Sequence, residues 1–178
     1  MTVANRIEMV VGDITTLDVD AVVTAANESL MGGGGVDGAV HAAAGPGLFE
    51  ECRSIGICPE GDARITGGYL LPAKHVIHTV GPVYEDGSYG EADVLRSAYE
   101  SSLRLAEEHS LCSVAFPCIA TGTYAFPHEA ACEIAVETVA AWLRGHEFPQ
   151  RVVFCCFDEP DISLYRGRLS QLGVALSD

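Results

Sequence analysis

Two stretches of the sequence carry the residue types best suited to chemistry: residues 32–35 (GGGG) and residues 121–124 (TGTY). The glycine run precedes a helical pattern, so its backbone N–H groups can approach a ligand closely at a helix N-terminus, where phosphate binds well. A flexible surface loop is the alternative interpretation. The second stretch also leads from a strand pattern toward a helical one. We predict that the two loops clasp a diphosphate, with Tyr124 offering a flat face to a sugar or base.

Asp37 follows the glycine run at the start of a predicted helix, a short distance in sequence from Asn27. A carboxylate at this place can polarise a water molecule as a general base, or it can simply stabilise the helix dipole. Asp13 is open to two interpretations as well, a turn residue or an acceptor for an exocyclic amine. His41, His75 and His78 are interpreted as structural. The sequence contains neither a GxSxG nor a GxxxxGK[ST] motif, so we expect neither a serine hydrolase nor a P-loop.

Strand and helix patterns alternate along the chain. Apolar runs bounded by breakers predict strands at residues 7–11, 21–25, 75–80, 113–116 and 151–157, with a weaker strand at 63–70. Helical spacing predicts helices at residues 36–44, 48–55, 91–109, 127–144 and 158–172. This order predicts an α/β protein, a three-layer α/β/α sandwich with a mixed, mostly parallel central sheet. Ligands of such sheets bind at the carboxyl ends of the strands, so the residues that follow each strand are the candidates for a site.

Composition narrows the classes of partner. The 178 residues predict a single domain, residues 1–178, and 10 Lys and Arg against 25 Asp and Glu give a net charge of −15. We therefore expect no nucleic acid and no membrane partner, although uncharged backbone donors can still bind an anion. No signal peptide or spanning segment is visible, and seven cysteines without CxxC spacing indicate reduced core thiols rather than a zinc site. A cytoplasmic protein is the expectation.

Seven stretches occur together and in order along nearly the whole chain. They are GDIT (12–15), AAN (25–27), GGGGVDGAVH (32–41), AGP (44–46), LPAKHVIHTVGP (71–82), FPCIATGTYAFP (116–127) and VVFCCFD (152–158). In this combination the sequence resembles a macrodomain of the MacroD-like type, and GGGGVDGA is the most specific element. The resemblance implies that ADP-ribose is the ligand. It also implies hydrolysis of ADP-ribose esters, which covers deacetylation of O-acetyl-ADP-ribose and removal of mono-ADP-ribose from Asp and Glu side chains of proteins.

The resemblance also implies a role for individual residues. Asp13 would accept a hydrogen bond from the adenine amine beside the Ile14 backbone, and Phe157 would stack on adenine near Asp158. Backbone N–H groups would hold the diphosphate, and they belong to Gly33, Gly34, Gly35, Val36, Thr121, Gly122, Thr123 and Tyr124. No metal and no cofactor are implied, and we expect a monomer.

Asn27 and Asp37 would be the catalytic pair. Asn27 would hold the distal ribose, on which Tyr124 packs, and Asp37 would activate the water that attacks the ester. In an alternative mechanism, the substrate's own phosphate orients the water and Asp37 holds the ribose. A second alternative concerns the whole protein, which could bind ADP-ribose without cleaving it.

The sequence departs from the family pattern at five positions. Thr24 stands where the family usually has Asn, and Ala42 stands where Arg is common. In the second loop, Ala120, Thr123 and Ala125 replace Ser, Val or Ile, and Gly. Alanine disfavours a positive φ, so a loop that needs one at residue 125 must shift, with a loss of about 1 kcal/mol or more in affinity.

Overall fold

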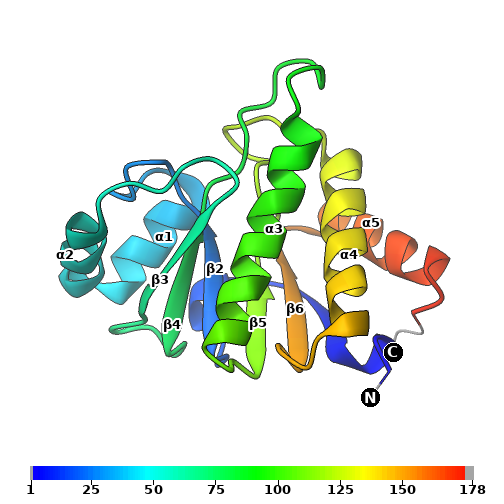
Figure 1. Cartoon of the computed structure of the whole chain (residues 1–178), viewed down its shortest axis with the longest axis horizontal. Coiled ribbons are helices and arrows are strands. Elements are labelled where there is room, and N and C mark those ends of the chain that lie inside the picture. The colour runs from blue at the N-terminus through cyan, green and yellow to red at the C-terminus, as the bar shows by residue number, and fades with distance from the viewer. Residues whose placement is uncertain (1, 175–178) are drawn as a thin grey trace.

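A six-stranded sheet forms the centre of the protein (Figure 1), as seen in a computed structural model that describes residues 2–174. The strands are β1 (Ile7–Val11), β2 (Ala21–Ala25), β3 (Ala63–Gly67), β4 (His75–Thr79), β5 (Ser113–Phe116) and β6 (Arg151–Cys156). Their spatial order is β1-β6-β5-β2-β4-β3, and every neighbouring pair is parallel except β3 and β4. The predicted mixed, mostly parallel sheet is confirmed.

Helices cover both faces of this sheet. They are α1 (Gly35–Ala44), α2 (Pro46–Ile55), α3 (Glu91–Glu108), α4 (His128–Gly145) and α5 (Glu159–Gln171), with short 3-10 helices at Ala4–Arg6 and Ile14–Thr16. Figure 1 shows α3 and α4 lying across one face, with α1 and α2 packed on the other side of the sheet. Successive strand residues alternate between the two cores, since Val22 belongs to the α1–α2 core and Val23 to the α3–α4–α5 core. The three-layer sandwich is therefore confirmed.

Local chemistry explains the boundaries of the elements. Asp158 caps α5 from outside, because its side chain accepts a hydrogen bond of 3.0 Å from the Asp161 N–H, and the helix begins one residue later than expected. The strand expected over residues 63–70 ends at Gly67. A Cβ on Gly68 would lie 1.9 Å from the Ala73 carbonyl oxygen, so the chain must turn there on a glycine.

The strand order decides where the predicted site residues lie. Because β1, β6, β5 and β2 are parallel neighbours, their carboxyl ends share one edge of the sheet. Neighbouring strands lie about 4.8 Å apart, so these four ends extend over roughly 14 Å. Asp13 follows β1, Phe157 follows β6, the second loop follows β5 and Asn27 follows β2. An elongated ligand can therefore contact all four loops in sequence.

Two further expectations concern thiols and membranes. All seven cysteines are free, and five of them are buried, but Cys112 is exposed and Cys118 is half-buried, so not every thiol belongs to the core. Among residues 2–174, no helix has the length and apolar character that a membrane crossing requires.

Candidate functional site

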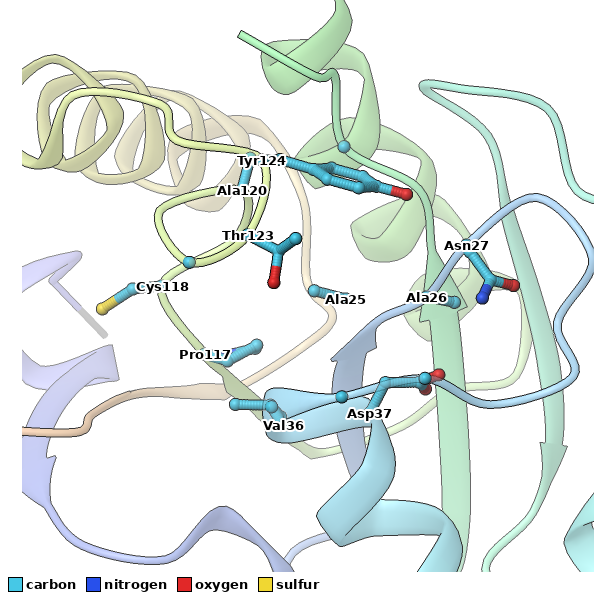
Figure 2. A pocket seen from close by; sticks show the side chains of 15 residues that line it. Ala25, Ala26, Asn27, Val36, Asp37, Pro117, Cys118, Ala120, Thr123 and Tyr124 are labelled. Carbon is cyan, nitrogen blue, oxygen red and sulfur yellow. The ribbon is translucent and has the colours of Figure 1, made fainter.

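A pocket of about 280 Å³ opens at the carboxyl ends of β2 and β5. We call residues 32–36 the glycine loop and residues 120–125 the alanine loop; both wall this pocket (Figure 2). The lining residues are Ala25, Ala26, Asn27, Gly33, Gly34, Gly35, Val36, Asp37, Gly81, Pro117, Cys118, Ala120, Gly122, Thr123 and Tyr124. Figure 2 shows the Tyr124 ring above the pocket, with Asn27 and Asp37 together on one side of it. The structure thus brings together most of the residues that the sequence places at a diphosphate and a distal ribose.

Backbone donors are available on both walls. Within the described residues, the N–H groups of Gly33, Gly34, Gly35 and Val36 donate no hydrogen bond; Gly35 and Val36 belong to the first turn of α1, and Gly33 and Gly34 directly precede it. The same holds for the N–H groups of Thr121, Gly122, Thr123 and Tyr124. No Lys or Arg side chain lines the pocket. Free amides and the positive end of the α1 dipole therefore make the pocket suited to an anion without any formal positive charge.

Asp37 is the one carboxylate in the pocket lining, and it is 3% exposed. Its Oδ1 accepts a hydrogen bond of 3.0 Å from the Thr24 hydroxyl, while its Oδ2 has no partner among the described residues. Burial raises the pKa of this carboxyl above its ordinary range, and nearby His41 and the Thr24 hydroxyl oppose that effect only in part. A fixed carboxylate with one free oxygen and a raised pKa has the properties of a general base.

Asn27 fastens the glycine loop to β2. Its Nδ2 donates to the Gly32 carbonyl at 3.0 Å, and its Oδ1 accepts from the Ser29 hydroxyl at 2.7 Å. A Cβ on Gly33 would lie 3.6 Å from the Asn27 Nδ2 and 3.9 Å from the Asp37 Oδ2. Both polar groups therefore border the same small volume against the glycine loop, where a bound sugar could contact them together.

The buried Cys52 and His78 and the partly buried His41 form a cluster that adjoins Asp37 through His41. His41 Nε2 lies 3.8 Å from Asp37 Oδ1 and has no hydrogen-bond partner among the described residues. His78 contacts Thr66 through Nε2 at 2.9 Å, and Cys52 Sγ packs against its ring. Ligand atoms of His41, Cys52 and His78 all lie within 4.8 Å of one another. Desolvation lowers the pKa of His78 to about 3, so its ring is neutral. Our interpretation of His78 as structural fits this place, but the contact of His41 with Asp37 was not anticipated.

The alanine loop adopts left-handed backbone at two alanines. Ala120 has φ 67° and Ala125 has φ 59°, both in the region that glycine favours. Hydrogen bonds close the loop from Phe126 N–H to the Ala120 carbonyl and from Ala125 N–H to the Gly122 carbonyl, both 2.9 Å long. Residue 125 does need a positive φ. The loop keeps this conformation with alanine and carries the strain.

The residues predicted to hold adenine lie outside the pocket, at the ends of β1 and β6. Asp13 accepts hydrogen bonds from the N–H and the hydroxyl of Thr15, which lower its pKa and make it the cap of the 3-10 helix at Ile14–Thr16. The Ile14 side chain is buried in the core.

At the end of β6, the Phe157 side chain is 85% exposed, and Asp158 caps α5. A hydrogen bond of 3.1 Å from the Gly12 N–H to the Cys156 carbonyl ties these two loop starts together. The geometry leaves their role in binding a prediction.

Three residues of the site escaped the sequence interpretation. Thr24 was identified only as a departure from the family pattern, whereas it holds Asp37. Gly81 packs under the alanine loop, where a Cβ would lie 3.1 Å from the Ala120 Cβ. Gly38 presses α1 on the glycine loop, since a Cβ there would lie 2.5 Å from the Gly33 carbonyl oxygen. A glycine inside a helical pattern is a signal for close backbone approach, and it could have identified Gly38.

One residue predicted to hold the diphosphate, Thr121, does not line the pocket. Its hydroxyl donates a hydrogen bond to the Cys118 carbonyl.

Fold and pocket together define an α/β protein that presents backbone amides and one buried carboxylate at the carboxyl edge of its sheet. Residues 23–135 match the family model of the Macro domain. The chain is 51% identical, over 95% of its length and 98% of the relative's, to a protein of Escherichia fergusonii named O-acetyl-ADP-ribose deacetylase. It is 49% identical to mouse "ADP-ribose glycohydrolase MACROD2", over 96% of this chain and 36% of that protein.

Solved structures agree with this relationship. A mutant of the Oceanobacillus iheyensis macrodomain, solved with ADPR, superposes with a TM-score of 0.90 at 38% identity, and the match covers 95% of this chain and 94% of that one. The protein belongs to the macrodomain family.

Proposed function

We propose that this macrodomain binds ADP-ribose and hydrolyses ester-linked ADP-ribose, with Asp37 as the general base. One observation carries the proposal: a buried carboxylate, held by Thr24 through one oxygen, borders a pocket of free backbone amides with its other oxygen unpartnered among the described residues. The names of two relatives, O-acetyl-ADP-ribose deacetylase and ADP-ribose glycohydrolase, support a hydrolase of this ligand class.

Binding follows from the order of the loops along the sheet edge. Adenine would lie at the ends of β1 and β6, against the exposed Phe157 ring and beside Asp13. The diphosphate would lie between the glycine and alanine loops, whose free N–H groups replace its hydration. The distal ribose would then reach Asn27 under the Tyr124 ring. Fixing the nucleotide along its length places the ester beside Asp37 and removes much of the entropy cost of the reaction.

The chemical step uses the free oxygen of Asp37. A water molecule at Oδ2 loses a proton to the carboxylate and attacks the ester carbonyl carbon, while N–H groups near Gly34 and Gly35 stabilise the developing negative oxygen. The carbonyl–oxygen bond to ribose then breaks, the ribose oxygen takes up the proton, and ADP-ribose and a carboxylic acid leave. The raised pKa of Asp37 improves its strength as a base.

The test compares Asp37→Asn and Asn27→Ala with the wild type on O-acetyl-ADP-ribose and on a protein that carries mono-ADP-ribose on Glu. We expect Asp37→Asn to lower kcat at least about 100-fold, with ADP-ribose affinity retained. Asn27→Ala should weaken binding as well. Asp93→Asn is a matched control, because Asp93 also occupies the third position of a helix but is exposed and pairs with Arg96 at 2.8 Å.

Three results distinguish the alternatives. Unchanged turnover in Asp37→Asn would leave water activation to the substrate's own phosphate. Tight ADP-ribose binding by the wild type without any product release would make the protein a binding module. Absence of binding to millimolar ADP-ribose would remove the proposal altogether.

A further inference from the structure

The margin of the pocket beside Asn27 and Tyr124 is acidic. Glu28 follows Asn27 directly and is exposed, and Glu60 is exposed in the loop that leads into β3. A hydrogen bond of 2.9 Å from the Cys58 N–H to the Glu28 carbonyl ties these two segments together. We call Glu28 and Glu60 the acidic rim.

The rim lies within electrostatic reach of the site. Tyr124 lines the pocket, and after burial, the charges of Glu60, Glu28 and Asp37 are the causes that raise the pKa of its hydroxyl. The loop after β4 adds two more exposed acids, Glu85 and Asp86, directly after Tyr84. The Tyr84 N–H donates to the Tyr124 carbonyl at 2.8 Å, so this third segment is joined to the same side of the pocket.

No free positive side chain offsets these acids within the loops of the described chain. The segments at the carboxyl edge of the sheet contain neither Lys nor Arg; they are residues 12–16, 26–34, 56–62, 80–90, 117–127 and 157–158. Arg64, at the start of β3, is the nearest basic residue along the chain, and its guanidinium pairs with Asp62 at 2.7 Å. The backbone amides that suit the diphosphate lie inside the pocket, whereas the loops around it carry acidic side chains and neither Lys nor Arg.

We propose that the acidic rim selects the polypeptide part of the substrate, so that the enzyme prefers ADP-ribosylated acidic side chains flanked by Lys or Arg. This inference rests on the proposed function, because it assigns the rim to the acyl side of the same ester. The rim borders the pocket in which the ester would lie. At the wall of that pocket, the buried Oδ2 of Asp37 has no partner among the described residues, as expected of a group that contacts a ligand.

Simple electrostatics gives the direction of the preference. A cation on the flanking peptide is attracted to Glu28 and Glu60, whereas an acidic flank is repelled. Charges on an interface rim act chiefly on association rate and on salt dependence. At physiological ionic strength the interaction fades beyond about 8 Å, so residues next to the modified side chain should matter most. A small acetyl ester carries no flank, so its response to the rim reports only the anionic ADP-ribose part that all the substrates share.

The experiment uses three peptides that carry mono-ADP-ribose on one Glu and differ only in the flanking residues, which are Lys, Ser or Glu. We expect kcat/KM to fall in the order Lys, Ser, Glu, with a spread of roughly tenfold at low salt that shrinks to about threefold or less at high salt. In the double variant Glu28→Gln/Glu60→Gln the spread should fall to about twofold, whereas any change in the rate on O-acetyl-ADP-ribose is common to the three peptides and leaves their order unaffected.

A matched double variant removes the same charge elsewhere. Glu108 ends α3 and Glu147 lies between α4 and β6, so both are at the opposite edge of the sheet, and neither lines the pocket. Glu108→Gln/Glu147→Gln should keep the wild-type preference. A preference lost equally in both double variants would show that net charge, not the rim, sets it, and would overturn the proposal.

Binding data separate this inference from the proposed function. The affinities of the three peptides for Asp37→Ala, measured by calorimetry, should follow the same order whether or not the wild type hydrolyses them. Equal affinities and equal rates on all three peptides would overturn the rim proposal and leave the hydrolase proposal intact. Failure of free ADP-ribose to bind would instead overturn the proposed function.

Discussion

The two loops that wall the pocket reach similar backbone conformations with different residues. The glycine loop has positive φ at Gly32 (88°) and Gly35 (58°), and the alanine loop has it at Ala120 (67°) and Ala125 (59°). Glycine adopts these angles at no steric cost, whereas an alanine carries strain of order ~1 kcal/mol or more. Both loops present free N–H groups to the pocket, but the backbone of the glycine loop is unstrained and that of the alanine loop is strained.

The glycine loop is associated with an electrostatic cost instead of a conformational one. It leads into Asp37, a carboxylate that is buried although burial disfavours its charge. The glycine loop therefore has an unstrained backbone but leads into a carboxylate whose charge is disfavoured by burial. The alanine loop has a strained backbone and no charged side chain. Destabilised groups at a site are maintained only where the surrounding structure fixes them, so each loop must be held by specific contacts.

The largest expected effect tests the contact that fixes the glycine loop. Gly38→Ala places a Cβ where the Gly33 carbonyl oxygen lies 2.5 Å away, so the loop must move off α1. We expect a loss of roughly 1–3 kcal/mol in stability and at least about a tenfold loss of ADP-ribose affinity, measured by urea unfolding and calorimetry.

Gly167→Ala is the control, since Gly167 lies inside α5 and a Cβ there would meet nothing within 4 Å. It should stabilise the protein by roughly 0.5–1 kcal/mol. Wild-type binding by Gly38→Ala would mean that the glycine loop is not held rigidly, and the contrast between the two loops would lose its basis.

The second effect concerns the hydroxyl that orients Asp37. Thr24→Val removes the donor to Oδ1 while keeping the shape of a fully buried side chain. Loss of a hydrogen bond to a buried charged group costs about 1.5–3 kcal/mol, so we expect kcat for ester hydrolysis to fall at least about tenfold with little change in ADP-ribose affinity.

Thr24→Ser restores the hydroxyl and should recover most of the rate. The acid side of the pH–rate profile should also move to higher pH in Thr24→Val, because the lost hydrogen bond had lowered the pKa of Asp37. An unchanged profile in Thr24→Val would show that this hydroxyl does not act on the carboxylate.

The contrast between the loops also shows what the sequence could reveal. Four consecutive glycines before a helix predicted the first wall, and the TGTY stretch between a strand and a helical pattern predicted the second. The family resemblance added the correct concern that residue 125 needs a positive φ. The bond between Thr24 and Asp37 was not predictable from spacing, because it joins β2 to α1 and depends on their packing. The positive φ of Ala120 was likewise hidden, because alanine in a sequence carries no signal for left-handed backbone.

The third effect concerns the free-energy cost of ionising the buried Asp37 carboxyl. The folded-state pKa of Asp37 is raised, so the folded protein holds this proton more tightly than the unfolded chain does. Ionisation therefore costs stability as the pH rises from the ordinary Asp range through the folded pKa. Asp37→Asn removes the charge and should raise the free energy of unfolding near pH ~8 by roughly 0.5–2 kcal/mol.

This gain should shrink as the pH falls below the ordinary Asp range, where Asp37 is protonated in both states of the wild type. The exposed match, Asp93→Asn, should give no gain at any pH. A constant gain across pH would assign the effect to packing, and a loss of stability in mildly alkaline buffer would show that the buried charge is well compensated.

The smallest expected effect isolates the backbone strain of the alanine loop. Ala125 is exposed, so Ala125→Gly relieves a positive φ without removing buried surface, and it should stabilise the protein by roughly 0.5–1 kcal/mol. Ala120 has the same kind of backbone but is 6% exposed and packs beside Gly81. Ala120→Gly gains a similar relief but loses a buried methyl worth about 0.8 kcal/mol, so its stability should stay near the wild-type value. The free energy of unfolding of both variants, measured in urea, tests this difference. An equal increase in both would show that the Ala120 methyl contributes nothing to stability. No increase in Ala125→Gly would show that the loop holds its alanines without strain.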